Sequence, residues 1–173
     1  LSFGGEGPCS PLEQDAIDEI TARGAVVIAA AGNEDGDVAA YSPGNCSNVV
    51  TVAATTRSGA RAWYTNSGSG VDVSATGGDF TDPILSTGNS GTMTPEEDAF
   101  VGVAGTSFAT AHVSGIAGLV LSVNGDLNSR QVREILVSSA RPFPDASCNA
   151  LICGSGIVDA NAAVQLAMDV QGQ

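Results

Sequence analysis

The feature that most restricts the fold of this chain is the segment GTSFATAHVSG at residues 105–115, which continues as an apolar run to Val123. A glycine that permits a tight turn is followed by small residues, which predicts a helix packed closely against its neighbours, central and buried. Ser107 is predicted as the N-cap of this helix. There its hydroxyl would lie among unpaired N–H groups that can stabilise an oxyanion. The alternative is an ordinary capped core helix.

Segments at residues 25–31, 48–54 and 71–74 predict strands. The first is apolar throughout, which is typical of a strand buried on both faces of a parallel sheet. The order of strands and helices favours a doubly wound α/β fold. Sites in such folds form at the carboxyl ends of strands, and Asn33 lies at the end of the first one.

Capping signals and 3–4 spacing of apolar residues predict the remaining helices. Ser10 and Glu13 form a capping box that starts the first of them. Further helices are predicted at residues 129–140 and in a last segment that runs to Met168. Residues 77–98 are rich in Gly, Ser, Thr and Asp and are predicted to be a surface excursion.

The segment at residues 105–115 resembles the nucleophile segment of subtilisin-like serine proteases, the subtilases, usually GTSMA-[AT]-PHV-[AS]-G. It has two departures, Phe108 where methionine is usual and Ala111 where proline is usual. Residues 27–34 (VIAAAGNE) and 2–5 (SFGG) resemble two more segments of that family. The resemblance covers nearly the whole chain and implies a subtilase-type three-layer α/β/α sandwich with a mainly parallel sheet.

The resemblance implies that Ser107 is the nucleophile and that the Asn33 side chain donates to the oxyanion. It also implies substrate-binding roles for Ser2, Phe3 and Gly4 along the substrate backbone, for Ala30, Ala31 and Gly32 as a pocket wall, and for Glu34 near the pocket mouth. Small wall residues leave room for Phe, Leu, Met or Tyr before the scissile bond. The expected substrate is an extended protein or peptide, and the chemistry requires no cofactor.

The general base is not evident in this chain. The one histidine, His112, lies five residues after Ser107, which on a helix is ~140° around the axis and ~7.5 Å along it. The resemblance implies that this histidine is structural and that subtilases carry Asp and then His before the serine. Residues 1–173 are therefore expected to form the C-terminal part of a single catalytic domain, partnered by a complementary N-terminal half.

Two other readings compete with this one. An inactive fragment that acts as a binding or structural module stays open. An esterase of α/β-hydrolase type is rejected, because that fold requires G-x-S-x-G and a histidine after the serine.

Charge narrows the range of partners. The formal net charge is −13, with six arginines and no lysine among 173 residues. Such a surface argues against nucleic acid or an anionic membrane as a partner. We expect no apolar run of this chain to be long enough to span a bilayer.

Four cysteines allow three pairings. The short loop between Cys148 and Cys153 favours their bonding to each other, which leaves Cys9 with Cys46. Zinc is the competing interpretation, but the chain has no C-x-x-C spacing. Disulfides indicate a location outside the cytosol, so a secreted protein is expected.

A structural calcium ion is a further possibility. Asp72 matches a position where some subtilases use a carboxylate together with nearby backbone carbonyls, here those near Ser47 and Val49. Oxygen ligands suit calcium. The alternative is a solvated aspartate.

Overall fold

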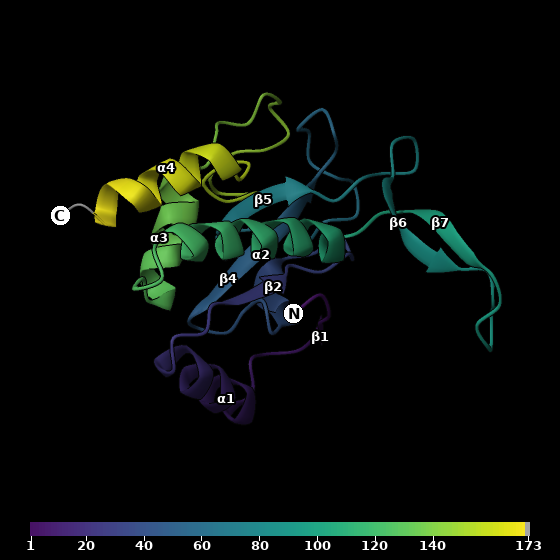
Figure 1. Ribbon diagram of the computed structural model, residues 1–173. Helices are drawn as coiled ribbons and strands as arrows, with labels where there is room; N and C mark the ends of the chain where they lie inside the picture. The colour runs from purple at the N-terminus through teal and green to yellow at the C-terminus, as the bar shows by residue number, and fades with distance from the viewer. Residues whose placement is uncertain (172–173) are drawn as a thin grey trace.

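A parallel sheet forms the centre of the computed structural model, which describes residues 1–171 (Figure 1). Its strands are β2 (Val27–Ala30), β4 (Val49–Thr55) and β5 (Val73–Thr76), in the order β2-β4-β5. All three strands are parallel, with Val27 opposite Val49 and Val52 opposite Val73. The predicted parallel sheet is therefore confirmed.

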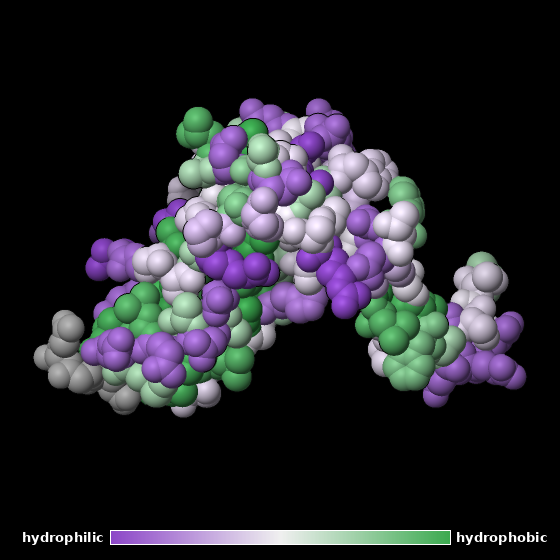
Figure 2. All heavy atoms as spheres, turned by 90° about the horizontal axis from the view of Figure 1, so that it is seen from above, coloured by the Kyte–Doolittle hydropathy of each residue, from purple (hydrophilic) through white to green (hydrophobic). Residues whose placement is uncertain are grey.

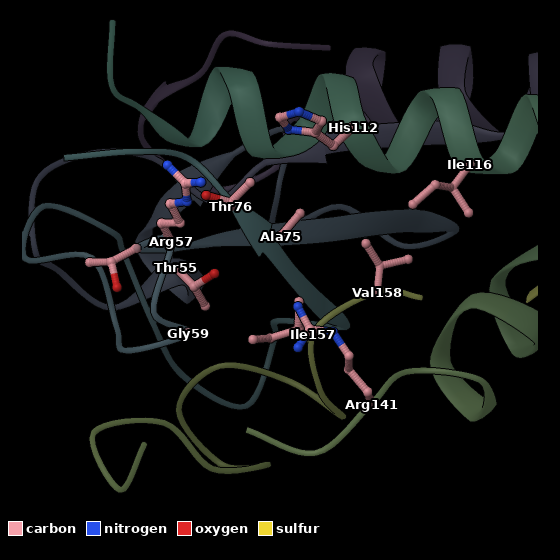
Figure 3. A pocket seen from close by; sticks show the side chains of 11 residues that line it. Thr55, Arg57, Gly59, Ala75, Thr76, His112, Ile116, Arg141, Ile157 and Val158 are labelled. Atoms are coloured by element: carbon pink, nitrogen blue, oxygen red, sulfur yellow. The ribbon is translucent and has the colours of Figure 1, made fainter. Parts of the chain in front are cut away.

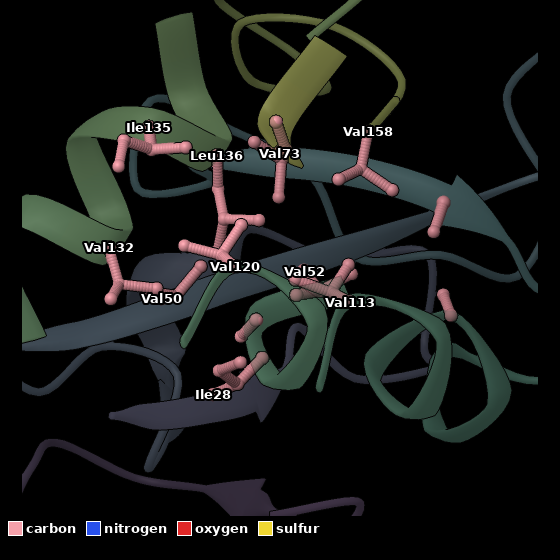
Figure 4. Close-up of a cluster of buried hydrophobic side chains, with 14 of the residues drawn as sticks. Ile28, Val50, Val52, Val73, Val113, Val120, Val132, Ile135, Leu136 and Val158 are labelled. Carbon is pink, nitrogen blue, oxygen red and sulfur yellow. The ribbon is translucent and has the colours of Figure 1, made fainter. Parts of the chain in front are cut away.

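Alternate residues of the strands face two different layers, because side chains in a strand point to opposite faces. Ile28, Val50 and Val52 pack with the helices α2 (Thr106–Val123), α3 (Ser129–Ser138) and α4 (Ala160–Gln171) in the main core (Figure 4). Val27 and Val49 pack on the other face with Ile17 of α1 (Pro11–Ala22). The result is the predicted three-layer α/β/α arrangement.

Local signals set the starts of two helices. The Ser10 hydroxyl accepts the N–H of Glu13 at 3.2 Å, and Glu13 Oε2 accepts the N–H of Ser10 at 2.9 Å, so the predicted capping box of α1 is confirmed. An equivalent box joins Asn128 and Gln131 at the start of α3. These reciprocal bonds satisfy N–H groups that the helices leave without partners.

The start of α2 corrects one prediction. Its N-cap is Gly105, and Ser107 is the second helical residue, not the cap. Six of its residues are buried: Thr106, Ala109, Thr110, Val113, Ala117 and Val120. The opposite side, which includes Ala111, Ser114, Gly115 and Gly118, is exposed. The helix is therefore central but covered on one side only, where full burial was expected.

The length of α2 corrects a second expectation. Among the described residues it is the one helix long and apolar enough to cross a membrane, with 18 residues and a mean hydropathy of 1.4. A core helix of a soluble protein meets the same criteria. Its buried side chains pack on the sheet, as expected of a core helix.

Antiparallel pairs complete the fold. Strand β1 (Gly5–Glu6) pairs with β3 (Tyr41–Ser42), which follows the short 3-10 helix η1 (Val38–Ala40). Strands β6 (Ile84–Asn89) and β7 (Asp98–Val103) form a hairpin that projects from the body (Figure 1). The predicted excursion is thus at the surface, but it contains a strand that the sequence did not indicate.

The hairpin presents apolar residues to solvent. Leu85 and Phe100 are 71% and 75% exposed, and hydrophobic atoms gather over this arm in Figure 2.

Both predicted disulfides are present. Cys9 bonds to Cys46 with their Cα atoms 5.1 Å apart, and Cys148 bonds to Cys153 with their Cα atoms 5.5 Å apart. The first bond ties the segment before α1 to the loop before β4.

Candidate active site

A small cleft of about 50 Å³ lies where β2 ends and α2 begins. Every residue that the sequence singled out for catalysis or substrate binding lines it: Ser2, Phe3, Gly4, Ala30, Ala31, Gly32, Asn33, Glu34 and Ser107. The structure adds three residues to this lining: Tyr41, Ser42 and Thr106. Ser2 and Ser107, which are 105 residues apart in sequence, thus meet at one place.

Ser107 is placed by the first turn of α2. The first N–H groups of a helix have no partner within the helix, so the backbone N–H of Ser107 is free of the helical ladder. Its hydroxyl donates to the carbonyl oxygen of Ser2 at 2.9 Å, and the Ser2 hydroxyl donates to the carbonyl of Ser107 at 3.1 Å. These reciprocal bonds hold the segment at residues 2–4 beside the helix start.

The side chain of Asn33 has a defined orientation. Its Oδ1 accepts the backbone N–H of Thr106 at 2.8 Å and the Thr106 hydroxyl at 2.9 Å. A backbone N–H can only donate, so this end of the amide must be the oxygen. The amide nitrogen therefore lies at the other end and is available as a donor. Thr106 is fully buried and links Asn33 to Ser107. The sequence did not point to it, because a threonine at the start of a helix carries no chemical signal of its own.

Glu34 does not extend freely over the pocket mouth. Its Oε2 accepts the backbone N–H of Asn33 at 2.8 Å and a side-chain N–H of Asn66 at 2.8 Å. Its charge also acts on the phenol of Tyr41. The pKa of Tyr41 is raised first by desolvation and then by the negative charges of Glu34 and Glu6. The cleft is therefore acidic at this side.

His112 lies away from the cleft. It lines a different cavity of about 240 Å³ together with Arg57, Ile116 and Arg141 (Figure 3). No histidine is among the described residues that line the Ser107 cleft. The position of His112 agrees with the helical geometry, which turns it away from Ser107.

The carboxylate of Asp72 already has a cationic partner. Its Oδ1 accepts from the guanidinium of Arg133, and its Oδ2 accepts the N–H of Thr51 at 2.8 Å. Among residues 1–171 no three His, Cys, Asp or Glu side chains form a group that could hold a metal ion. A calcium ion at Asp72 stays a prediction that this geometry does not favour, because a guanidinium occupies the carboxylate.

The family model of the subtilase family matches residues 1–165. The chain belongs to the subtilase family. It is 45% identical over 170 residues to an extracellular protease of Xanthomonas campestris. The aligned region covers 98% of this chain and 28% of that protein. It is 40% identical over 177 residues to an extracellular basic protease of Dichelobacter nodosus, covering 100% of this chain and again 28% of that protein.

Solved structures agree with this assignment. A protease from Pseudoalteromonas arctica superimposes with a TM-score of 0.92 at 45% identity, over 96% of this chain and 50% of that one. A cold-adapted subtilisin-like serine proteinase gives a TM-score of 0.73 at 29% identity, over 90% and 53%. The subtilase chain described here thus spans about a quarter of these curated relatives and about half of the solved chains.

Proposed function

We propose that residues 1–173 are the C-terminal part of the catalytic domain of a serine endopeptidase. The observation that carries the proposal is the placement of Asn33 and Ser107 at one cleft, locked together through Thr106. A nucleophile and an oxyanion donor from two separate segments are the pair that acyl transfer requires.

The chemistry follows from these positions. Ser107 Oγ attacks the carbonyl carbon of the scissile peptide bond while its proton passes to a general base, and the carbonyl oxygen becomes an oxyanion. The Asn33 amide and the Ser107 N–H donate to that oxyanion. The base then gives its proton to the leaving amine as the C–N bond breaks, which leaves the acyl group on Ser107; water, giving a proton to the same base, attacks this ester, and Ser107 Oγ leaves with the proton. No cofactor takes part in these steps.

The base and its orienting carboxylate are proposed to come from a segment outside residues 1–173. Three observations support this. His112 lines a different cavity, the relatives are much longer than this chain, and α2 has an exposed side of small residues. Small residues let another helix approach closely, so a complementary N-terminal half is a fitting partner for that side.

The substrate is proposed to be a protein or peptide bound as an extended strand along Ser2, Phe3 and Gly4. The residue before the scissile bond would lie against Ala30 and Ala31, which leave space for a large apolar side chain. The two disulfides and the relatives named as extracellular proteases support secretion. The net charge of −13 disfavours nucleic acid and anionic membranes as partners.

Labelling with a serine-directed phosphonate tests the proposal in the full-length protein. We expect one modified site in the wild type, none in Ser107→Ala, and wild-type labelling in Ser122→Ala, which removes an exposed serine at the far end of the same helix. Equal labelling of the wild type and Ser107→Ala would contradict the assignment of the nucleophile.

Comparison of the isolated 173-residue chain with the full-length protein separates the two readings that the sequence left open. If the general base lies outside residues 1–173, the phosphonate should label the isolated chain no faster than it labels Ser107→Ala. The full-length protein should be labelled at Ser107. A folded full-length protein that binds peptides but is never labelled would support the inactive binding module instead. Full activity of the isolated chain would contradict the external base.

A further inference from the structure

A buried asparagine lies under the loop that carries Asn33. Asn66 is fully buried and makes four side-chain hydrogen bonds, the full capacity of its amide. Its Oδ1 accepts the N–H groups of Glu34 at 3.0 Å and Gly36 at 2.8 Å. Its Nδ2 donates to the carbonyl of Ala31 at 3.0 Å and to Glu34 Oε2 at 2.8 Å. One side chain thus connects both ends of the loop that follows β2.

These bonds lead directly to Asn33. The same Glu34 oxygen that Asn66 binds also accepts the backbone N–H of Asn33 at 2.8 Å. The side chain of Asn33 is fixed separately by Thr106. The oxyanion donor is therefore held at two points, at its backbone through Glu34 and Asn66 and at its side chain through Thr106.

Asn66 also lies directly against the wall of the predicted pocket. Its backbone N–H donates to the carbonyl of Gly32 at 3.0 Å. A Cβ atom placed on Gly32 would lie 2.2 Å from Asn66 Nδ2, and the φ of +105° at Gly32 already favours glycine. The amide therefore fills the space that a side chain at Gly32 would need.

We infer that Asn66 is a positioning residue for peptide hydrolysis, acting through Asn33 and the pocket wall without touching the substrate. This inference rests on the proposed function. Because oxyanion stabilisation depends on donors fixed before the reaction, a loosened loop should lower kcat more than it changes KM.

The variant Asn66→Asp gives this role a distinct signature. It keeps the shape and the acceptor oxygen, but it places a carboxyl oxygen where Nδ2 donates to Glu34 Oε2 at 2.8 Å. Two carboxyl groups at that distance share a proton, and the pKa of one of them rises strongly. While the pair holds its proton, the contact survives. Once the proton is lost, repulsion displaces Glu34 and removes the acceptor for the Asn33 N–H.

The experiment measures kcat and KM of the full-length protease from neutral to alkaline pH. The wild type should hold its kcat on the alkaline side, whereas Asn66→Asp should lose at least about tenfold there, the size of one lost hydrogen bond to a charged carboxylate. The double variant with Glu34→Gln should lose this pH dependence, because it removes the second carboxylate, but its kcat should stay low at every pH, since one glutamine atom cannot both donate to position 66 and accept the Asn33 N–H. A pH profile of Asn66→Asp parallel to the wild type would overturn the inference.

Asn124→Asp is the matched control. Asn124 is 4% exposed and donates to the carbonyl of Ala167 at 3.1 Å, about 25 Å from Ser107 along α2 by the helical rise. It should lower stability but leave the alkaline kcat profile unchanged. If Asn66→Asp does not fold, Asn66→Ser should show a reduced kcat with little change in KM, and an unchanged kcat would overturn the inference.

The two proposals fail differently. A wild type that phosphonate does not label at Ser107 refutes the proposed function. A labelled, active wild type with a normal Asn66→Asp profile refutes only the positioning role.

Discussion

Replacing Thr106 with valine tests how Asn33, the proposed oxyanion donor, is held. Thr106 Oγ1 donates to Asn33 Oδ1 at 2.9 Å, and the backbone N–H of Thr106 donates to the same oxygen at 2.8 Å. Valine keeps the side-chain shape and removes only the hydroxyl donor. Asn33 then keeps one of the two bonds that fix the orientation of its amide.

The size of the effect follows from that count. A buried neutral hydrogen bond contributes about 0.5–1.5 kcal/mol, which corresponds to a loss of about 2- to 12-fold in kcat if all of it acts on the transition state. The loss should stay well below that for removing Asn33 itself. In subtilisin, a member of the same family, loss of the asparagine oxyanion donor lowers kcat by about 10²–10³.

A double-mutant cycle in the full-length protein makes the test specific. With a peptide anilide substrate, we expect Thr106→Val to lower kcat with little change in KM, and to have no further effect in an Asn33→Ala background. If the same loss appears in both backgrounds, Thr106 acts independently of Asn33 and our reasoning about the bridge is wrong.

Two further predictions concern stability, both measured by denaturant unfolding. Arg133→Met leaves Asp72, whose side chain is 9% exposed, without its cation and should lower the free energy of unfolding by about 1–3 kcal/mol; an unchanged midpoint would contradict the ion pair. Burial raises the pKa of Tyr64 from 10.0 to about 12, so the folded state keeps a proton that the unfolded chain loses. Wild-type stability should therefore fall as pH rises from about 10 to about 12, and Tyr64→Phe should reduce this slope. Equal slopes would show that Tyr64 is not responsible.

The sheet and the first helix could be predicted from the sequence because their signals are local. Residues 25–31 are apolar throughout, and strand β2 lies within them. Ser10 and Glu13 are three residues apart and cap the same helix. In such cases the pattern and the contact that it describes lie within one segment.

The errors arose where contacts between distant segments decide the structure. Thr106 begins α2 while its N–H binds Asn33, 73 residues away, so no local rule could choose among Gly105, Thr106 and Ser107 as the cap. The calcium site at Asp72 stays a prediction; it included backbone carbonyls near Ser47 and Val49, and no local pattern indicated Arg133, which lies beside Asp72 from 61 residues further along. Asn66 carried no signal beyond that of a turn residue.

The resemblance and the structure agree best at the cleft. All nine residues assigned from family motifs line it, because each motif brings its own loop to the same edge of the sheet. Their individual roles stay predictions until the variants are measured.

The close contact between Gly32 and Asn66 also limits how such a pocket can evolve. Any side chain at position 32 would collide with the amide of Asn66 and with Glu34, whose Oε2 lies 2.7 Å from the place that a Cβ atom would take. A larger residue could enter only after position 66 had become smaller, and that intermediate would lose the bonds by which Asn66 supports the loop that carries Asn33. Descendants of this subtilase chain should therefore diverge in specificity through Tyr41 or Ala30 and keep Gly32 and Asn66 together as one inherited pair.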